Sequence, residues 1–148
     1  MQEQINISEL LNKFLADEFT LYVKTLNYHW NVQGPHFKEY HVFLEETYNE
    51  LQESIDAIAE RVRTVGSRPL STMTEFSKET SLKEEPGVYP DAMTMLNNLK
   101  SDYESVIKYV KECIDKISDS DDIGTEDFFT EQLRVHEKRL WMIEEITA

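Results

Sequence analysis

The sequence has few residues of the kinds that cross-link a chain or hold it in a membrane. Its 148 residues include a single cysteine, so no disulfide can form within the chain, and a reducing environment is expected. No apolar run approaches the length of a membrane span, and the opening Met-Gln-Glu-Gln is unlike a signal peptide. These absences predict a cytoplasmic protein that does not cross a membrane.

Basic residues are also scarce. There are 15 Lys and Arg against 29 Asp and Glu, which gives a net charge of −14. Phosphate backbones attract Lys and Arg and repel carboxylates, so we expect no nucleic-acid partner. An acidic surface concentrates cations, although acidity can also serve solubility alone.

Glycine and proline, at four residues each, are confined to three windows: Gly34-Pro35, Gly66 to Pro90, and Gly124. Because both residues break helices, the windows divide the chain into four long segments. Each segment carries apolar residues at helical spacing, and these are Leu15, Phe19, Tyr22 and Leu26; Leu44, Tyr48, Leu51, Ile55 and Ile58; Leu96, Leu99, Tyr103 and Val106; and Phe129, Leu133, Leu140 and Ile143. The length and composition are those of one domain over residues 1–148.

Four amphipathic helices without an alternating strand pattern predict an antiparallel bundle. The first connection is tight, whereas the connection between the second and third helices is long. In that connection Thr72 and Glu75 form a capping-box pattern, which predicts a short helix near 73–78. A long crossover at this place is typical of ferritin-like bundles. We therefore predict an all-α, ferritin-like four-helix bundle whose crossover contains a short extra helix.

Two histidines and two carboxylates form a candidate metal-ligand set. His29 and His41 flank the tight turn, so an antiparallel hairpin brings them close together, and Asp56 and Glu60 share one helix face at i and i+4. Imidazole and carboxylate together suit iron(II) and iron(III). The alternatives are that the histidines are ordinary core residues and that the carboxylates lie on a solvated face with Arg63 as an ion-pair neighbour.

The spacing of these residues bears on assembly. If residues 36–65 form one helix, His41 and Asp56 are separated by roughly 22 Å along its axis, which no single metal site can span. Either the four residues are unrelated, or a second copy of the chain completes the site. The Glu-x-x-His pattern of ordinary intrachain di-iron bundles is absent, because no histidine has a glutamate three positions earlier.

These residues belong to a longer motif that resembles the signature of the Dps family, the mini-ferritins of the ferritin-like superfamily. The motif is Asn27-x-His29-Trp30-Asn31-Val32-x-Gly34, then Phe37, His41 and Phe43, then Asp56-x-x-Ala59-Glu60-Arg61-x-Arg63-x-x-Gly66-x-x-Pro69-x-x-Thr72. The resemblance covers nearly the whole chain, including the short extra helix and Leu140-Trp141-Met142.

The resemblance implies a dodecameric hollow shell with ferroxidase sites at two-fold interfaces, each taking two iron ions. His29 and His41 would come from one subunit, and Asp56 and Glu60 from its neighbour. The implied function is an iron-sequestering ferroxidase that oxidises Fe(II), preferentially with hydrogen peroxide, and stores Fe(III) mineral, which protects against oxidative damage. Trp30 would lie beside the iron and intercept radicals, or else pack as an interface aromatic.

The resemblance also implies that acidic residues near the start of the last helix line three-fold pores that admit Fe(II). The candidates are Asp122, Asp127 and Glu131, for which a solvated helix N-terminus is the alternative. Family members that condense DNA carry a lysine-rich tail, but no basic residue precedes Lys13 here. We therefore expect no DNA binding; the alternative function is a non-enzymatic DNA-compacting Dps protein.

Overall fold

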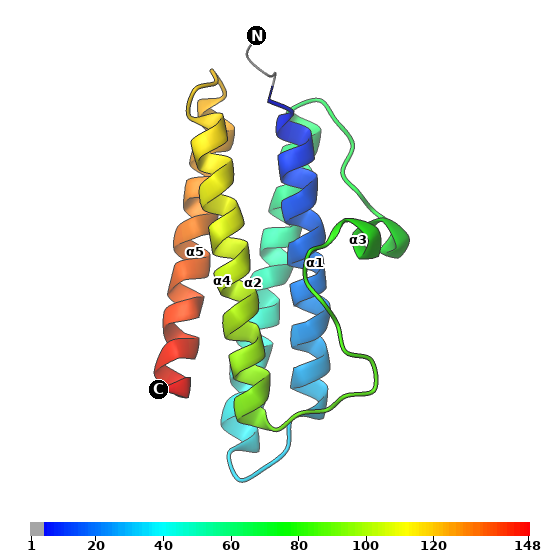
Figure 1. Cartoon of the computed structure of the whole chain (residues 1–148), viewed down its shortest axis with the longest axis vertical. Helices are drawn as coiled ribbons and strands as arrows, with labels where there is room; N and C mark the ends of the chain where they lie inside the picture. Colours follow the sequence, from blue (N-terminus) through cyan, green and yellow to red (C-terminus); the bar gives the residue numbers. More distant parts are fainter. Residues whose placement is uncertain (1–4) are drawn as a thin grey trace.

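The computed structural model describes residues 5–148, which form five helices and no strand. Their bounds are α1 (Ile7–Asn31), α2 (Phe37–Thr64), α3 (Met73–Glu79), α4 (Ala92–Ile117) and α5 (Ile123–Thr147). The four long helices form the bundle, and α3 lies beside it on the α2–α4 crossover (Figure 1). The predicted all-α bundle with a short crossover helix is confirmed. The signal-peptide expectation concerns residues 1–4, which lie outside the described part.

The crossover sets the directions of the helices. It leaves α2 at one end of the bundle, passes α3, and begins α4 at the other end, so α4 runs parallel to α2 (Figure 1). The contacting bundle pairs are α1 with α2, α4 with α5, α1 with α4, and α2 with α5. In each of these pairs the helices run in opposite directions, as the prediction of an antiparallel bundle required.

Local sequence signals explain where two elements begin and end. At α3 the Thr72 side chain accepts from the Glu75 backbone N–H, and the Glu75 side chain accepts from the Thr72 N–H, a complete capping box. Between α1 and α2, Gly34 has a φ of 127°, a backbone conformation that favours glycine. This turn is short enough to place the end of α1 beside the start of α2.

The bundle interior is largely apolar, and one cluster of its buried polar side chains joins three of the helices. Core residues on the predicted stripes include Leu15, Leu51, Leu99 and Phe129, and Cys113 packs among such side chains. Glu18, Ser54, Gln132 and His136 lie inside the same bundle and are hydrogen-bonded to one another. Across residues 5–148, none of the helices combines the length and apolarity that a bilayer crossing demands.

Candidate iron-binding site

The two motif histidines lie against each other. His29 is in the last turn of α1 and His41 in the second turn of α2. Their rings stack with centroids 3.8 Å apart and planes 12° apart. His29 is buried and His41 is half-buried. The hairpin thus brings together the two histidines that flank the turn in the sequence, as predicted.

Each histidine is fixed by the backbone of the other. Nδ1 of His29 lies 2.7 Å from the carbonyl oxygen of His41, and Nδ1 of His41 lies 2.8 Å from the carbonyl oxygen of His29. A carbonyl oxygen can only accept, so both Nδ1 atoms carry a hydrogen and donate it. In the neutral imidazole this leaves the Nε2 lone pair of each ring free.

This arrangement is the one that a metal-binding histidine requires. When Nδ1 donates to a carbonyl, the tautomer and the ring orientation are fixed, and Nε2 becomes the more basic ligand atom. An ordinary core histidine would instead satisfy both ring nitrogens within the protein, as His136 does with the Gln132 carbonyl and the Glu18 carboxylate. The geometry therefore favours ligand roles for His29 and His41.

The candidate carboxylates, Asp56 and Glu60, lie further along α2 and are both exposed. Asp56 lies in a surface hollow that Phe19 and Tyr22 of α1 also line. Among residues 5–148 neither carboxylate belongs to an ion pair. The suggested neighbour Arg63 instead donates to the carbonyl oxygen of Ser67.

The histidine pair and the carboxylate pair do not meet within one chain. Since α2 is a single uninterrupted helix, His41 and Asp56 are roughly 22 Å apart along its axis. Within the described residues, no group of three or more His, Cys, Asp or Glu side chains is placed to hold a metal ion. The two candidate pairs therefore lie in separate parts of the α1–α2 hairpin.

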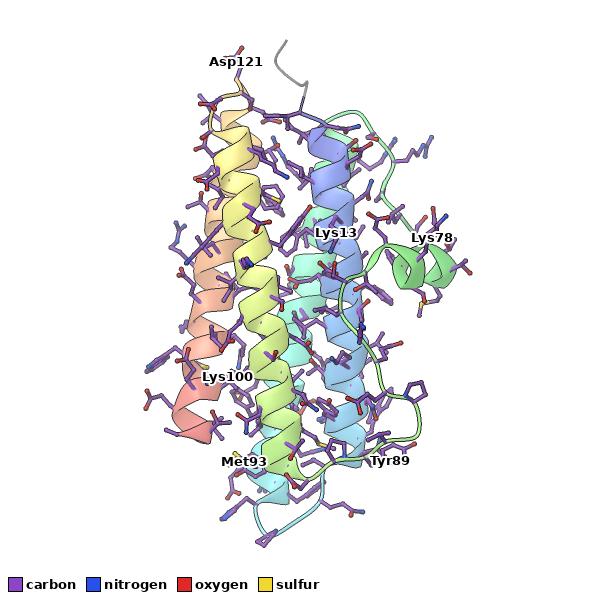
Figure 2. All side chains as sticks on the ribbon, viewed as in Figure 1. Lys13, Lys78, Tyr89, Met93, Lys100 and Asp121 are labelled. Carbon is purple, nitrogen blue, oxygen red and sulfur yellow. The ribbon has the colours of Figure 1, made fainter. Side chains whose placement is uncertain are left out.

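The other residues singled out from the sequence lie in different surroundings. Trp30 follows His29 at the end of α1, and 68% of its surface is exposed. Asp127 and Glu131 are exposed on α5. They lie near the α4–α5 turn, which Asp121 marks in Figure 2, at the end of the bundle opposite the histidine pair.

Asp122 differs from the other two pore candidates because its carboxylate is already engaged. It caps α5 by accepting from the Thr125 N–H and hydroxyl, and it pairs with Arg61 at 3.2 Å. Burial alone would raise the pKa of Asp122, but these hydrogen bonds and the Arg61 charge outweigh it and lower the pKa. The capping of α5 agrees with the alternative of a helix N-terminus for Asp122, whereas the ion pair with Arg61 was not expected from the sequence.

Comparison with known proteins identifies the family. The ferritin-like domain family matches residues 8–148. A DNA protection during starvation protein of Brevibacillus brevis is 36% identical, over 93% of this chain and 92% of its own. The chain belongs to the Dps family. An uncharacterised low-temperature-induced protein of Nostoc, 43% identical over 96% of this chain and 80% of its own, is a further relative.

Solved Dps structures have the same fold. The Staphylococcus aureus Dps structure aligns with a TM-score of 0.93 at 31% identity, covering 100% of this chain and 99% of that one. The Vibrio cholerae O1 Dps protein, described as a member of a broad superfamily of ferritin-like diiron-carboxylate proteins, aligns with a TM-score of 0.91 at 29% identity, covering 96% and 89%. Dps membership supports iron sequestration, protection from oxidative damage and homo-oligomeric assembly in general.

Two side chains beside the candidate ligands were not recognised from the sequence as parts of this region. Tyr48 packs edge-on against His29, with ring centroids 5.2 Å apart, although its place among apolar residues at helical spacing predicted only a core role. Arg61 connects α2 to Thr125 and Asp122 at the start of α5. Its place in the motif beside Glu60 is the one signal that marked it, and that signal does not reveal its partners.

Proposed function

We propose that this Dps protein is a ferroxidase whose iron sites are shared between two subunits. His29 and His41 of one subunit would face Asp56 and Glu60 of the partner subunit across a two-fold interface. The observation that carries the proposal is the pair of Nδ1 hydrogen bonds, which leaves the Nε2 atoms of two stacked rings without a partner among residues 5–148. Asp56 and Glu60, roughly 22 Å further along α2, are exposed and form no ion pair among residues 5–148, so they are available to complete the site of a second subunit.

The ligand set suits the oxidation of iron as a substrate. Imidazole nitrogens bind Fe(II), while carboxylates favour the harder Fe(III) and offset its added charge. Two Fe(II) at one site can supply both electrons that peroxide needs, so that two Fe(II), one hydrogen peroxide and two protons yield two Fe(III) and two water molecules. This consumes both reagents of hydroxyl-radical chemistry. The preference for peroxide over dioxygen belongs to this proposal.

The product would be stored as Fe(III) mineral inside a dodecameric shell, with Fe(II) admitted past Asp127 and Glu131. The exposed ring of Trp30, next to His29 in the chain, would face the interface and intercept any radical released there. Each of these roles follows the family pattern, and the exposure of all three side chains in the single chain accords with it.

Co-assembly of complementary variants tests the shared site. One chain carries His29→Ala and His41→Ala, and the other carries Asp56→Ala and Glu60→Ala. At a mixed interface one site has all four ligands and the other has none, so mixed shells should oxidise Fe(II) although each parent shell does not. Verified mixed shells that remain as inactive as their parents would overturn the proposal.

A second mixture separates a shared site from an intrachain one by its dose response. Wild-type chains are co-assembled with the quadruple variant lacking all four ligands. If a site needs two wild-type chains, activity should fall as the square of the wild-type fraction. Intrachain sites would instead make it fall in direct proportion.

DNA compaction is the second candidate, favoured by the DNA-protection name of the Brevibacillus relative. The net charge of −14 opposes direct binding to a phosphate backbone. Ferroxidase activity is therefore the better-supported function.

A further inference from the structure

A row of aromatic rings runs along the contact between α1 and α2. It starts at the histidine pair, where the Tyr48 ring lies 5.2 Å from the His29 ring. The Tyr22 ring follows at 6.1 Å from Tyr48, and the Phe19 ring at 5.9 Å from Tyr22. Both tyrosines are half-buried, so they are largely shielded from solvent without being part of the bundle core.

The row ends at the carboxylate half of the chain. Tyr22 and Phe19 line the same hollow as Asp56. A single subunit therefore connects its histidine pair to its carboxylate region through Tyr48 and Tyr22, ring against ring.

In the shared-site arrangement, on which this inference rests, those two ends belong to different iron sites. The histidines serve one site of a two-fold interface, and the carboxylates of the same chain serve the other. We propose that Tyr48 and Tyr22 carry electrons between the two iron sites of one interface.

Such a path would supply the second electron that the reduction of hydrogen peroxide to water requires. A site holding one Fe(II) can give peroxide only one electron, which releases a hydroxyl radical and hydroxide. If Tyr48 supplies the second electron together with its phenolic proton, peroxide is reduced to water and a tyrosyl radical remains. An electron then passes from Tyr22 to the Tyr48 radical, and Fe(II) at the far site reduces the resulting Tyr22 radical. Each phenol regains a proton as it is reduced.

The overall reaction, summed over both sites, is the same as that of a single site that holds two Fe(II). Two Fe(II), one at each site, react with one hydrogen peroxide and two protons to give two Fe(III) and two water molecules. No other oxidant or reductant is needed. The path lets two half-filled sites act together when iron is scarce, the condition under which a single Fe(II) would release a radical.

The rings at both ends of the row are suited to confine the oxidised state. Phe37 stacks on His41 with centroids 4.8 Å apart, and Phe76 stacks on Phe19 at 4.4 Å. Phenylalanine is much harder to oxidise than tyrosine. A radical formed in the row therefore stays on Tyr22 or Tyr48 until Fe(II) reduces it.

The test compares Tyr48→Phe and Tyr22→Phe with a matched control, Tyr40→Phe. Both test variants keep the ring and remove the oxidisable phenol. Tyr40 is a half-buried residue of α2 whose ring faces His36, outside the row. Assembled protein is loaded without oxygen at one Fe(II) per site and mixed with limiting hydrogen peroxide. Fe(III) formed per peroxide, spin-trapped hydroxyl radical and the frozen-solution tyrosyl signal are measured.

Wild type and Tyr40→Phe should oxidise two Fe(II) per peroxide, show a transient tyrosyl radical and release little hydroxyl radical. Tyr48→Phe and Tyr22→Phe should fall toward one Fe(II) per peroxide, with a several-fold rise in trapped radical. At two Fe(II) per site all four proteins should behave alike, because each site then supplies both electrons.

The possible failures are distinguishable. If both test variants match wild type at one Fe(II) per site, the electron path is overturned while the ferroxidase stands. Equal losses at low and high iron loading would assign the tyrosines to packing of the site and also overturn the path. A wild-type protein that oxidises no iron would overturn the proposed function, and the path with it.

Discussion

Nε2 of His136 lies 2.7 Å from the Glu18 carboxylate in the interior of the bundle, where the two side chains are only 2% and 0% exposed. The pair joins α5 to α1, and Nδ1 of His136 contacts the Gln132 carbonyl oxygen. Every polar atom of the imidazole is thus satisfied, which makes the ion pair compatible with burial.

Removing either partner of this pair should destabilise the protein strongly. His136→Gln and Glu18→Gln each leave a buried polar or charged group without its partner, and we expect a loss of about 3–5 kcal/mol in the free energy of unfolding. Glu104→Gln, an exposed change on α4, is the control and should cost less than about 0.5 kcal/mol. Urea unfolding at one fixed protein concentration measures all three, and a loss below about 1 kcal/mol for both core variants would contradict the expectation.

The same pair predicts a pH dependence. Burial alone would lower the pKa of His136, but the charge and hydrogen bond of Glu18 outweigh it and raise the pKa. Because the folded-state pKa is raised, the contribution to stability is complete below the unfolded pKa of about 6.5 and is lost as pH rises through the folded pKa. The stability difference between wild type and His136→Gln should therefore shrink as pH is raised from about 6; a difference that grows would contradict this.

Two tyrosines of α4 provide a matched comparison. The Tyr109 hydroxyl donates to the Leu10 carbonyl oxygen at 2.8 Å, whereas the buried Tyr103 hydroxyl has no partner among residues 5–148. Tyr109→Phe should cost about 1 kcal/mol, while Tyr103→Phe should be neutral or slightly stabilising, because an unsatisfied buried hydroxyl is removed. Thermal or urea unfolding of the two variants checks the order, and a larger loss for Tyr103→Phe would reverse it.

The purified protein should not shift duplex DNA at physiological salt near neutral pH. With a net charge of −14, repulsion between the protein and the phosphates outweighs any local attraction. Gel-shift assays without iron or magnesium should show free DNA throughout. A clear shift at micromolar protein would favour DNA compaction instead, and a parallel series with magnesium would reveal bridging by divalent cations.

Asp127→Asn and Glu131→Gln, made together, should slow iron uptake at limiting Fe(II) and low salt. The two exposed carboxylates share one face of α5 at i and i+4, so their loss reduces the local attraction for cations. Asp122 is left intact because it caps α5 and pairs with Arg61.

Glu137→Gln with Glu144→Gln removes equal charge from exposed positions further along α5 and serves as the control. Wild-type uptake should slow with added salt, and uptake by the Asp127/Glu131 variant should respond less. Equal uptake by the two double variants under limiting iron would exclude Asp127 and Glu131 as the access route.

The features that the sequence predicted correctly are those encoded by local spacing. Helical periodicity identified the four long helices, and α2 at Phe37–Thr64 lies within the segment 36–65. The Thr72–Glu75 capping pattern located α3 to within a residue. The turn at Gly34 sufficed to predict that His29 and His41 lie close together, because a hairpin relates positions on either side of its turn.

Contacts between distant segments could not be predicted in this way. Glu18 and His136 are 118 positions apart, and each alone was indistinguishable from an ordinary helix residue. Arg61 pairs with Asp122, and Arg63 donates to a backbone carbonyl, because the angular position of each side chain around α2 decides its partners. The exchange of hydrogen bonds between the histidines involves backbone carbonyl oxygens, which every residue has and no motif marks.

The two reciprocal hydrogen bonds between His29 and His41 also bear on the order of events in a newly made chain. They join residues only 12 positions apart, so they close a short loop at small entropic cost and can form as soon as the hairpin does. If sites are shared as proposed, the two imidazoles are then in place before any partner arrives, and the carboxylates that complement them are supplied only by docking. In that case an unassembled chain holds two incomplete sites and is redox-silent. Quaternary assembly would then act as the checkpoint that switches the chemistry on.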